Sequence, residues 1–387
     1  MKKLISILLA LTMIAVLFAG CSGGDSSTST TAAAAQSTTA ATTAGSTEEQ
    51  TQEAGGLSGM KVAAVFTGPR GDSGTIDMAC RALEKMRDEE GLVITIVEGD
   101  GSNDTAKLEA AVMDVADDEY DMILSTGTMS DVFRAVAPDY PDTVFCLFDT
   151  TFDFSTYDAG NIYCANFMQN EGAYLAGILA MSMSKTGVVG FIGGMENANI
   201  CDFMWGFVEG AKYVNSAGTI AISFTGDWYD SAKAKEITLT QAGMGADVVF
   251  PASGPSQEGA YEGAAEAGIY SIGVDVDREA LYAASNPDWV EHILSSELKC
   301  VDVAVERAVR LFAAGELVMG QEALGIAEGG VDLCMDGNFR TLVPEDVQKV
   351  IEDAKTAIRN GELTIGTAIG ASAEEIAEIK AWAGRSE

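Results

Sequence analysis

Two aspartates that directly follow a short apolar run could take part in chemistry. Asp275 and Asp277 come after Ser271-Ile272-Gly273-Val274, a run typical of a buried strand. Paired carboxylates can act as acid and base, and an ionised carboxylate also accepts strong hydrogen bonds from sugar hydroxyls. Binding needs only one of the two, and a solvated loop acid is an equal alternative to a ligand contact.

The sequence offers little for catalysis or metal binding. His292 is the only histidine, so Ser-His-Asp or Cys-His catalysis would depend on it, and His-rich zinc sites are excluded. The run 100–104 resembles half a calcium loop but lacks the required glycine and glutamate, so Asn103 or Asp104 is better interpreted as a helix N-cap. We therefore expect no catalytic residue, no metal and no cofactor.

Strands and helices alternate along the chain in two series, and these elements must position the acids. The first series predicts strands at Lys61–Phe66, Val93–Val97, Met122–Ser125 and Val144–Phe148, with helices from about Ile76 to Glu90, Thr105 to Ala116 and Asp131 to Ala137. The second predicts strands at Val188–Ile192, Ile220–Phe224, Val248–Phe250 and Tyr270–Val274, with helices near Gly172–Met183, Ile200–Val214, Ala232–Ala242 and Gly259–Ala267. This alternation predicts an α/β fold of two similar, doubly wound lobes with parallel sheets.

Loops that follow strands are the places to search for a ligand site, because ligands of open parallel sheets bind beyond the carboxyl ends of the strands. The candidate loops are Gly68–Thr75, Ser125–Asp131, Gly193–Asn199, Gly226–Asp230, Ala252–Gln257 and Asp275–Arg278. A cleft between the two lobes would let both sets of loops converge on one small molecule.

The first part of the chain carries export signals. Lys2 and Lys3 precede an uncharged stretch that ends at Gly20, which is typical of a secretory signal peptide over residues 1–20. Small residues before Cys21 resemble a bacterial lipobox, so we expect cleavage before Cys21 and acylation of its thiol, with palmitate among the acyl chains; an ordinary signal peptide with an incidental cysteine is the alternative. Residues 21–56 are mostly small and polar, which predicts a flexible lipidated tether. The remainder would then be lipid-anchored on the extracytoplasmic face of the cell membrane.

The net charge narrows the class of partner, and the cysteine pattern bears on disulfide formation. A formal net charge of -35 argues against nucleic acid and anionic lipid headgroups as partners, and against a polyphosphate ligand. Six cysteines besides Cys21 occur without any Cys-x-x-Cys pair, some of them inside apolar runs, and we expect mostly buried free thiols rather than disulfides.

Six motifs follow one another through the middle of the chain. They are Asn170–Gly177, Val189–Met195, Gly206–Ala211, Gly245–Phe250, Ile272–Asp277 and Ser295–Asp302. In order and spacing they resemble the basic membrane protein family, the nucleoside-binding lipoproteins of bacterial ABC transporters. The resemblance implies a type I periplasmic-binding-protein fold with an interlobe cleft. The expected lobes are 57–168 plus about 292–325, and 169–291 plus about 326–387.

The same resemblance implies roles for individual residues. Asp275 and Lys299 correspond to residues that bind the ribose hydroxyls, and Asp131 corresponds to an aspartate that contacts the base. Trp228, within Gly226-Asp227-Trp228-Tyr229-Asp230, corresponds to one of two aromatic rings that stack on the base.

The first loop departs from the family pattern. Asp72-Ser73-Gly74-Thr75-Ile76 stands where the family has Asp-Lys-Ser-Phe-Asn, which places Asp72 and Thr75 at the site but removes the second ring and the asparagine. Either Phe66 or another aromatic substitutes, or the base pocket is wider or adapted to a different planar group.

These observations predict a monomeric solute-binding lipoprotein that is not an enzyme. It would bind a nucleoside, with a purine favoured, and deliver it for uptake to the permease and ATPase subunits of an ABC transporter. One alternative is a surface or sensory lipoprotein that binds another small planar or sugar-containing ligand. The other is a nucleoside hydrolase, which needs clustered aspartates near its first strand, where only Asp72 and Asp77 occur.

Overall fold

The computed structural model describes residues 56–71, 74–102, 104–157 and 159–384. The predicted signal peptide, Cys21, nearly all of the predicted tether, and Asp72 lie outside the described residues.

The first sheet is built from six parallel strands in the order β11-β5-β4-β3-β1-β2. They are β1 (Lys61–Val65), β2 (Val93–Val97), β3 (Met122–Thr126), β4 (Val144–Phe148), β5 (Ile162–Phe167) and β11 (Gly320–Leu324). Side chains alternate between its two faces, since Val62 and Ala64 belong to one hydrophobic cluster and Ala63 and Val65 to another. The helices of this part are α1 (Thr75–Glu90), α2 (Thr105–Asp117), α3 (Ser130–Val136) and α10 (Val301–Ala313). Both faces of the sheet are therefore buried, as a doubly wound sheet requires.

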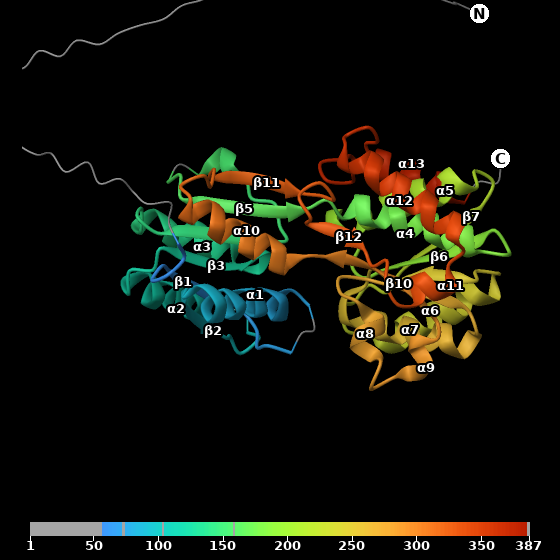
Figure 1. Cartoon of the computed structure of the whole chain (residues 1–387), viewed down its shortest axis with the longest axis horizontal. Helices are drawn as coiled ribbons and strands as arrows, with labels where there is room; N and C mark the ends of the chain where they lie inside the picture. Colours follow the sequence, from blue (N-terminus) through green and yellow to red (C-terminus); the bar gives the residue numbers. More distant parts are fainter. Residues whose placement is uncertain (1–55, 72–73, 103, 158, 385–387) are drawn as a thin grey trace, which may run out of the picture. The chain divides into compact units, whose positions relative to one another are not determined.

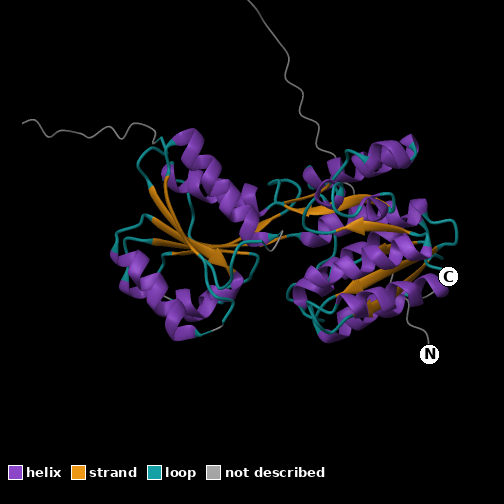
Figure 2. Ribbon diagram, turned by 90° about the horizontal axis from the view of Figure 1, so that it is seen from below, coloured by secondary structure: helices purple, strands orange, loops and turns teal. Residues whose placement is uncertain are grey.

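The second sheet has the order β12-β10-β9-β8-β6-β7, with β12 antiparallel to β10 and the other pairs parallel. Its strands are β6 (Val188–Gly193), β7 (Thr219–Phe224), β8 (Val248–Phe250), β9 (Tyr270–Gly273), β10 (Ile293–Lys299) and β12 (Val331–Leu333). Its helices are α4 (Gln169–Met183), α5 (Ala198–Val214), α6 (Ser231–Gly243), α7 (Gln257–Ala267), α8 (Arg278–Tyr282), α9 (Pro287–Val290), α11 (Asn338–Leu342), α12 (Glu345–Arg359) and α13 (Ala373–Ala383). Figure 2 shows helices on both sides of each group of strands.

The two sheets share one strand order. In the first sheet the order β2-β1-β3-β4-β5 matches the order β7-β6-β8-β9-β10 in the second, so β4 corresponds to β9 and β5 to β10. The prediction of two similar, doubly wound units is confirmed. The sequence analysis missed the fifth strand of each sheet, Ile162–Phe167 and Ile293–Lys299.

The chain passes between the sheets after β5, after β10 and between β11 and β12 (Figure 1). We expected the segment from about residue 292 in the first lobe, but β10 pairs with β9 and β12 in the second sheet. The polar run Ser295-Ser296-Glu297 hid this strand, although its backbone completes the sheet. Only after Lys299 does the chain return to the first sheet, where α10 packs against α1 and β11 pairs with β5.

Helices α4 and α5 pack at backbone contact. A Cβ atom at Gly206 would come within 2.7 Å of the carbonyl carbon of Asn170, and one at Gly210 within 2.9 Å of that of Tyr174. Only glycine allows this approach, which explains why the helices carry small residues where they meet. The contact holds the start of α5 beside the start of α4, where the side-chain amide of Gln169 donates to Asp202 at 2.8 Å.

The six cysteines of the described residues are all free thiols, as predicted. Cys80, Cys146, Cys164 and Cys201 are buried, whereas Cys300 and Cys334 are half-buried. Burial raises the pKa of Cys80 to about 11 and that of Cys164 to about 12. These thiols therefore stay protonated and weakly reactive near neutral pH.

Candidate functional site

Three charged side chains from both sheets meet at one point. The ammonium of Lys299, the last residue of β10, donates to both carboxylate oxygens of Asp149 at 3.0 and 3.2 Å. It also lies 4.0 Å from Oδ1 of Asp275. Asp149 directly follows β4, and Asp275 lies two residues after β9, the strand of the second sheet that corresponds to β4. The two carboxylates thus occupy equivalent strand ends on either side of one lysine.

Both aspartates have an unusual backbone conformation. The φ angle is 60° at Asp149 and 71° at Asp275, in the left-handed region that residues other than glycine seldom adopt. Aspartate and asparagine tolerate this region better than other side chains. The amide of Lys299 donates to the carbonyl oxygen of Asp275 at 3.0 Å, and the amide of Asp149 donates to Ala165 at 2.9 Å. Strained residues held by neighbouring strands are typical of functional sites.

The cluster presents acceptors to solvent and keeps its cation behind them. The side chain of Lys299 is 8% exposed, against 24% for Asp149 and 27% for Asp275. Burial by itself would lower the pKa of Lys299, but the carboxylates of Asp149, Asp275 and Glu297 outweigh it and raise the pKa. Burial raises the pKa of Asp149, although Lys299 opposes this effect. A ligand would therefore meet two carboxylates before it meets the ammonium.

Neighbouring residues fix the cluster on the side of the second sheet. Nε of Arg278 donates to the carbonyl oxygen of Val274 at 2.9 Å, and its guanidinium lies 3.9 Å from Oδ2 of Asp275. The ammonium of Lys299 lies 5.2 Å from the ring centroid of Phe203, a distance suited to a cation–π contact. Asp275 thus stands between two cations, Lys299 and Arg278.

Trp228 lies at the carboxyl end of the second sheet, in the loop after β7. A Cβ at Gly194, just after β6, would come within 2.5 Å of the indole, and one at Gly254, beyond β8, within 3.1 Å. The amide of Ser256 donates to the carbonyl oxygen of Trp228 at 2.8 Å. The indole, which is half-buried, therefore rests on glycine backbone at the ends of neighbouring strands.

The first sheet presents hydroxyls at its carboxyl end instead. Oγ1 of Thr126 lies 2.8 Å from Oγ1 of Thr128, which is 3.4 Å from Oγ1 of Thr67. Gly127 packs closely on Thr150, since a Cβ at Gly127 would come within 2.8 Å of its hydroxyl oxygen. This surface can exchange hydrogen bonds with a polar ligand.

The described contacts bring Asp275 and Lys299 together, but they do not join Asp131, Thr75 or Trp228 to this pair. Asp131 is exposed in the first turn of α3, and Thr75 is half-buried at the first position of α1. The sequence analysis missed Asp149. Its signal was present, because a carboxylate directly follows the predicted strand Val144–Phe148, as Asp275 follows its own strand.

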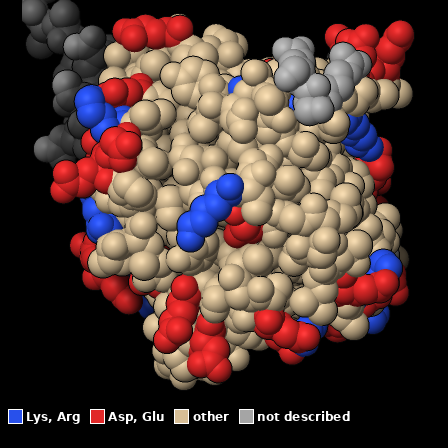
Figure 3. Space-filling view, turned by 90° about the vertical axis from the view of Figure 1, so that its right-hand side faces the viewer, with Lys and Arg blue, Asp and Glu red and all other residues tan. Residues whose placement is uncertain are grey.

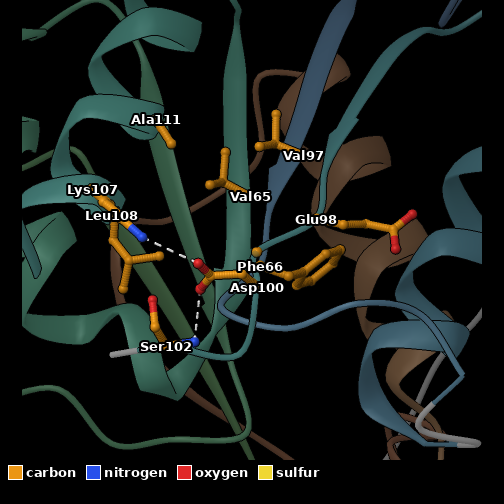
Figure 4. Close-up of a pocket in the computed structure, with 10 residues that line it drawn as sticks. Val65, Phe66, Val97, Glu98, Asp100, Ser102, Lys107, Leu108 and Ala111 are labelled. Atoms are coloured by element: carbon orange, nitrogen blue, oxygen red, sulfur yellow. Dashed lines mark hydrogen bonds and ion pairs between the residues drawn. The ribbon is translucent and has the colours of Figure 1, made fainter. Parts of the chain in front are cut away.

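A separate cavity of about 270 Å³ lies beside the ends of β1 and β2, next to α2 (Figure 4). Phe66 lines it but is only 1% exposed and belongs to the core, so its ring does not offer a free stacking face. The predicted N-cap is confirmed, because the side chain of Asp104 accepts from the amide of Lys107. Within the part of the chain that the structure describes, no group of acids, cysteines and histidine could hold a metal ion.

Comparison with known proteins decides the family. The model of the family described as Bmp, ABC transporter substrate-binding protein PnrA-like, matches residues 60–366, which is most of the chain. The chain belongs to the Bmp family. A Bmp protein is the substrate-binding component of an ABC transporter, so its partners are a small ligand and the permease and ATPase subunits.

Named relatives agree with this family. An ABC transporter nucleoside-binding protein, BmpA of Lactococcus lactis subsp. cremoris, is 31% identical over 64% of this chain and 71% of its own length. Basic membrane protein A1 of Borrelia garinii subsp. bavariensis is 26% identical over 79% of this chain and 88% of its own. The expected absence of enzymatic activity agrees with the family, whose members are substrate-binding proteins of ABC transporters.

The fold of this Bmp protein is the type I periplasmic-binding-protein fold, as expected. A solute-binding protein of an ABC transporter system from Aeropyrum pernix K1 superposes with a TM-score of 0.68 at 25% identity, covering 84% of this chain and 98% of the other. Among the described residues, no helix combines the length and apolar character that crossing a membrane requires.

Acidic side chains dominate the charged surface of the Bmp protein where it can be followed in Figure 3. On that face the charged side chains gather mainly around the edge, where acidic ones predominate over basic ones, and the middle is uncharged apart from one basic side chain beside an acidic one. Such a surface repels polyanions, which agrees with the net charge of -35.

Proposed function

We propose that this Bmp protein binds a nucleoside, with a purine base, and delivers it for uptake. The observation that carries the proposal is the proximity of Asp275 and Lys299 at the carboxyl end of the second sheet. A carboxylate and an ammonium 4.0 Å apart can bind the two hydroxyls of a ribose by charge-assisted hydrogen bonds. The two accessible carboxylates also oppose a phosphate, which favours a nucleoside over a nucleotide.

Trp228 would supply the stacking surface for the base. Its indole rests on glycine backbone at the ends of β6 and β8, which leaves little freedom for the ring to move away. Asp131 would contact the base, and Asp72 and Thr75 would approach from the first loop. The ligand would then lie between the two sheets, and its planar group would be bound more strongly from the second. The nucleoside-binding relative of Lactococcus lactis supports this choice of ligand.

A melting-temperature panel tests the ligand. Purified protein is heated with purine nucleosides, pyrimidine nucleosides, free bases and free sugars. A ligand that binds only the folded state raises the melting temperature, so purine nucleosides are expected to give the largest increase. The proposal fails if no nucleoside shifts the melt while a sugar or another metabolite does.

We further propose that acylated Cys21 anchors the protein to the extracytoplasmic face of the cell membrane through the tether 22–56. The sequence before Cys21 supports this location. Cells that express Cys21→Ser are expected to lose incorporation of labelled palmitate and to release the protein from the membrane fraction. Unchanged labelling would contradict the anchor at this residue.

A further inference from the structure

The accessible negative charge at the Lys299 cluster comes from Asp149 as well as from Asp275. Asp149 is nearly as exposed as Asp275, at 24% against 27% of the side chain. It reaches Lys299 from the first sheet, whereas Asp275 and Lys299 both belong to the second. A hydroxylated ligand in contact with Asp275 and Lys299 would therefore also lie close to Asp149.

The backbone at Asp149 suggests more than a salt bridge. Both Asp149 and Asp275 follow equivalent strands, and both hold φ angles in the left-handed region, at 60° and 71°. An ion pair with Lys299 does not by itself require this conformation, which is strained at a residue other than glycine. The same strain at both strand ends indicates that both carboxylates are directed toward one place.

The hydrogen-bonding capacity of Asp149 is not used up by Lys299. Each carboxylate oxygen can accept more than one hydrogen bond, and each oxygen of Asp149 already accepts from the same ammonium. Lys299 holds the carboxylate in place and leaves its other lone pairs free. A hydroxyl donor of the ligand can therefore bind Asp149 without breaking the ion pair.

We propose that Asp149 is a ligand-binding residue that accepts a hydrogen bond from one sugar hydroxyl, while Asp275 accepts from a different hydroxyl on the other side of Lys299. This inference rests on the proposed function, because it concerns the sugar part of the same ligand. It predicts that the site recognises a polyhydroxylated group from both sheets at once.

Asp149→Asn is the variant that tests this role with the least damage. Asparagine has the shape of aspartate, tolerates the left-handed backbone, and its carbonyl oxygen still accepts from Lys299. Asp142→Asn is the matched control, because Asp142 is exposed and lies just before the other end of β4. Circular dichroism and the melting temperature check that both variants fold.

The experiment is a thermodynamic cycle that combines one change in the protein with the removal of one hydroxyl at a time from the ligand. Calorimetry measures the dissociation constants of wild type and Asp149→Asn for a purine ribonucleoside and for its 2′-deoxy, 3′-deoxy and 5′-deoxy analogues. Asp149→Asn is expected to raise the dissociation constant of the ribonucleoside by about tenfold or more. For the one analogue that lacks the hydroxyl bound by Asp149, wild type and variant are expected to agree within about twofold, because the lost contact is absent from both.

Two results would overturn the inference. One is an equal loss for the ribonucleoside and all three analogues, which would show that Asp149 only positions Lys299. The other is unchanged affinity in Asp149→Asn. If wild type binds a free sugar instead of nucleosides, the proposed function fails and the same cycle is run with that sugar and its deoxy forms. A ligand without hydroxyls would contradict both proposals.

Discussion

The carboxyl ends of the two sheets have the same strand order but carry different chemistry. In the first sheet, threonine hydroxyls and Asp149 are presented. In the second, Asp275, Lys299 and Arg278 form one charged cluster, and the indole of Trp228 separately rests on glycine backbone at the same end of the sheet. Position on the fold thus decides where a side chain can act, whereas the residue type decides what it can do there.

The contrast is sharpest between β5 and β10. Counted back from the strand ends, Phe167 and Ala165 of β5 correspond to Lys299 and Glu297 of β10. All four side chains are buried, so the second sheet carries two ionisable groups where the first has apolar ones. If the second sheet holds the ligand and the first closes over it, changes in the second should have the larger effects.

Lys299→Met is expected to have the largest effect. Removing the ammonium leaves Asp149 next to Asp275 without a partner, which we expect to destabilise the fold by about 3 kcal/mol and to abolish nucleoside binding. Urea denaturation and calorimetry measure the two effects. Adding Asp149→Asn to this variant should recover part of the stability, because the unpaired carboxylate is removed. If stability does not recover, the ion pair between Lys299 and Asp149 does not stabilise the contact between the carboxyl ends of the two sheets.

Asp275→Asn should come next. Losing the charged acceptor is expected to weaken nucleoside binding by about 2 kcal/mol, as for a hydrogen bond to an ionised group. Asparagine is preferable to alanine here, because alanine at a φ of 71° would add backbone strain to the loss of the contact. Asp288→Asn on the exposed start of α9 is the control. Equal affinity in Asp275→Asn and wild type would remove Asp275 from the site.

Glu297→Gln tests the buried acid that the first sheet lacks. Neither carboxylate oxygen of Glu297 has a hydrogen-bond partner among the described residues, and burial, followed by the charge of Asp275, raises its pKa well above the ordinary value. The folded state thus holds the proton more tightly than the unfolded state, so stability is greatest below about pH 4 and falls as pH rises through the folded pKa. Each unit by which the folded pKa exceeds the unfolded pKa corresponds to about 1.4 kcal/mol in the free energy of unfolding.

Thermal melts between about pH 4 and pH 8 check this prediction, a range that starts near the ordinary pKa of glutamate. The melting temperature of Glu297→Gln should match that of wild type at the acidic end and exceed it increasingly toward neutral pH. Glu291→Gln, at an exposed position shortly before β10, is the control and should show no such divergence. Parallel curves for Glu297→Gln and wild type would mean that Glu297 does not titrate differently in the two states.

Trp228→Ala should have the smallest of these effects on binding, and it addresses the planar part of the ligand. The loss of stacking is expected to weaken the binding of a purine nucleoside by about 1 kcal/mol, while Trp228→Phe retains most of the affinity. A free sugar, if it binds, should be unaffected by either change. An equal loss for sugar and nucleoside would mean that Trp228 supports the loop rather than the base.

Much of this architecture could be predicted from the sequence, because local patterns carry it. The alternation of apolar runs and helical stretches fixed the two doubly wound units, and the carboxylate after Ile272-Gly273-Val274 pointed to Asp275. The place of Trp228 after β7 was also predictable, since it lies in a loop that follows a strand.

What could not be predicted depends on contacts between distant segments. Lys299 meets Asp149 only because β10 belongs to the second sheet and ends where β4 of the first sheet ends, 150 residues apart in sequence. The polar residues of β10 gave no strand signal, so its placement and the burial of Glu297 were missed. Asp149 itself was predictable as a candidate, because it directly follows the predicted strand Val144–Phe148.

Calorimetric titration of the wild-type protein with a purine ribonucleoside and its 2′,3′-dideoxy form tests the central claim most directly. Binding of the sugar by charged groups predicts that the ribonucleoside binds and that loss of both hydroxyls weakens it by about 100-fold, as expected for two charge-assisted hydrogen bonds. Equal affinity for the two forms, or binding of the free base alone, would contradict recognition through Asp275 and Lys299.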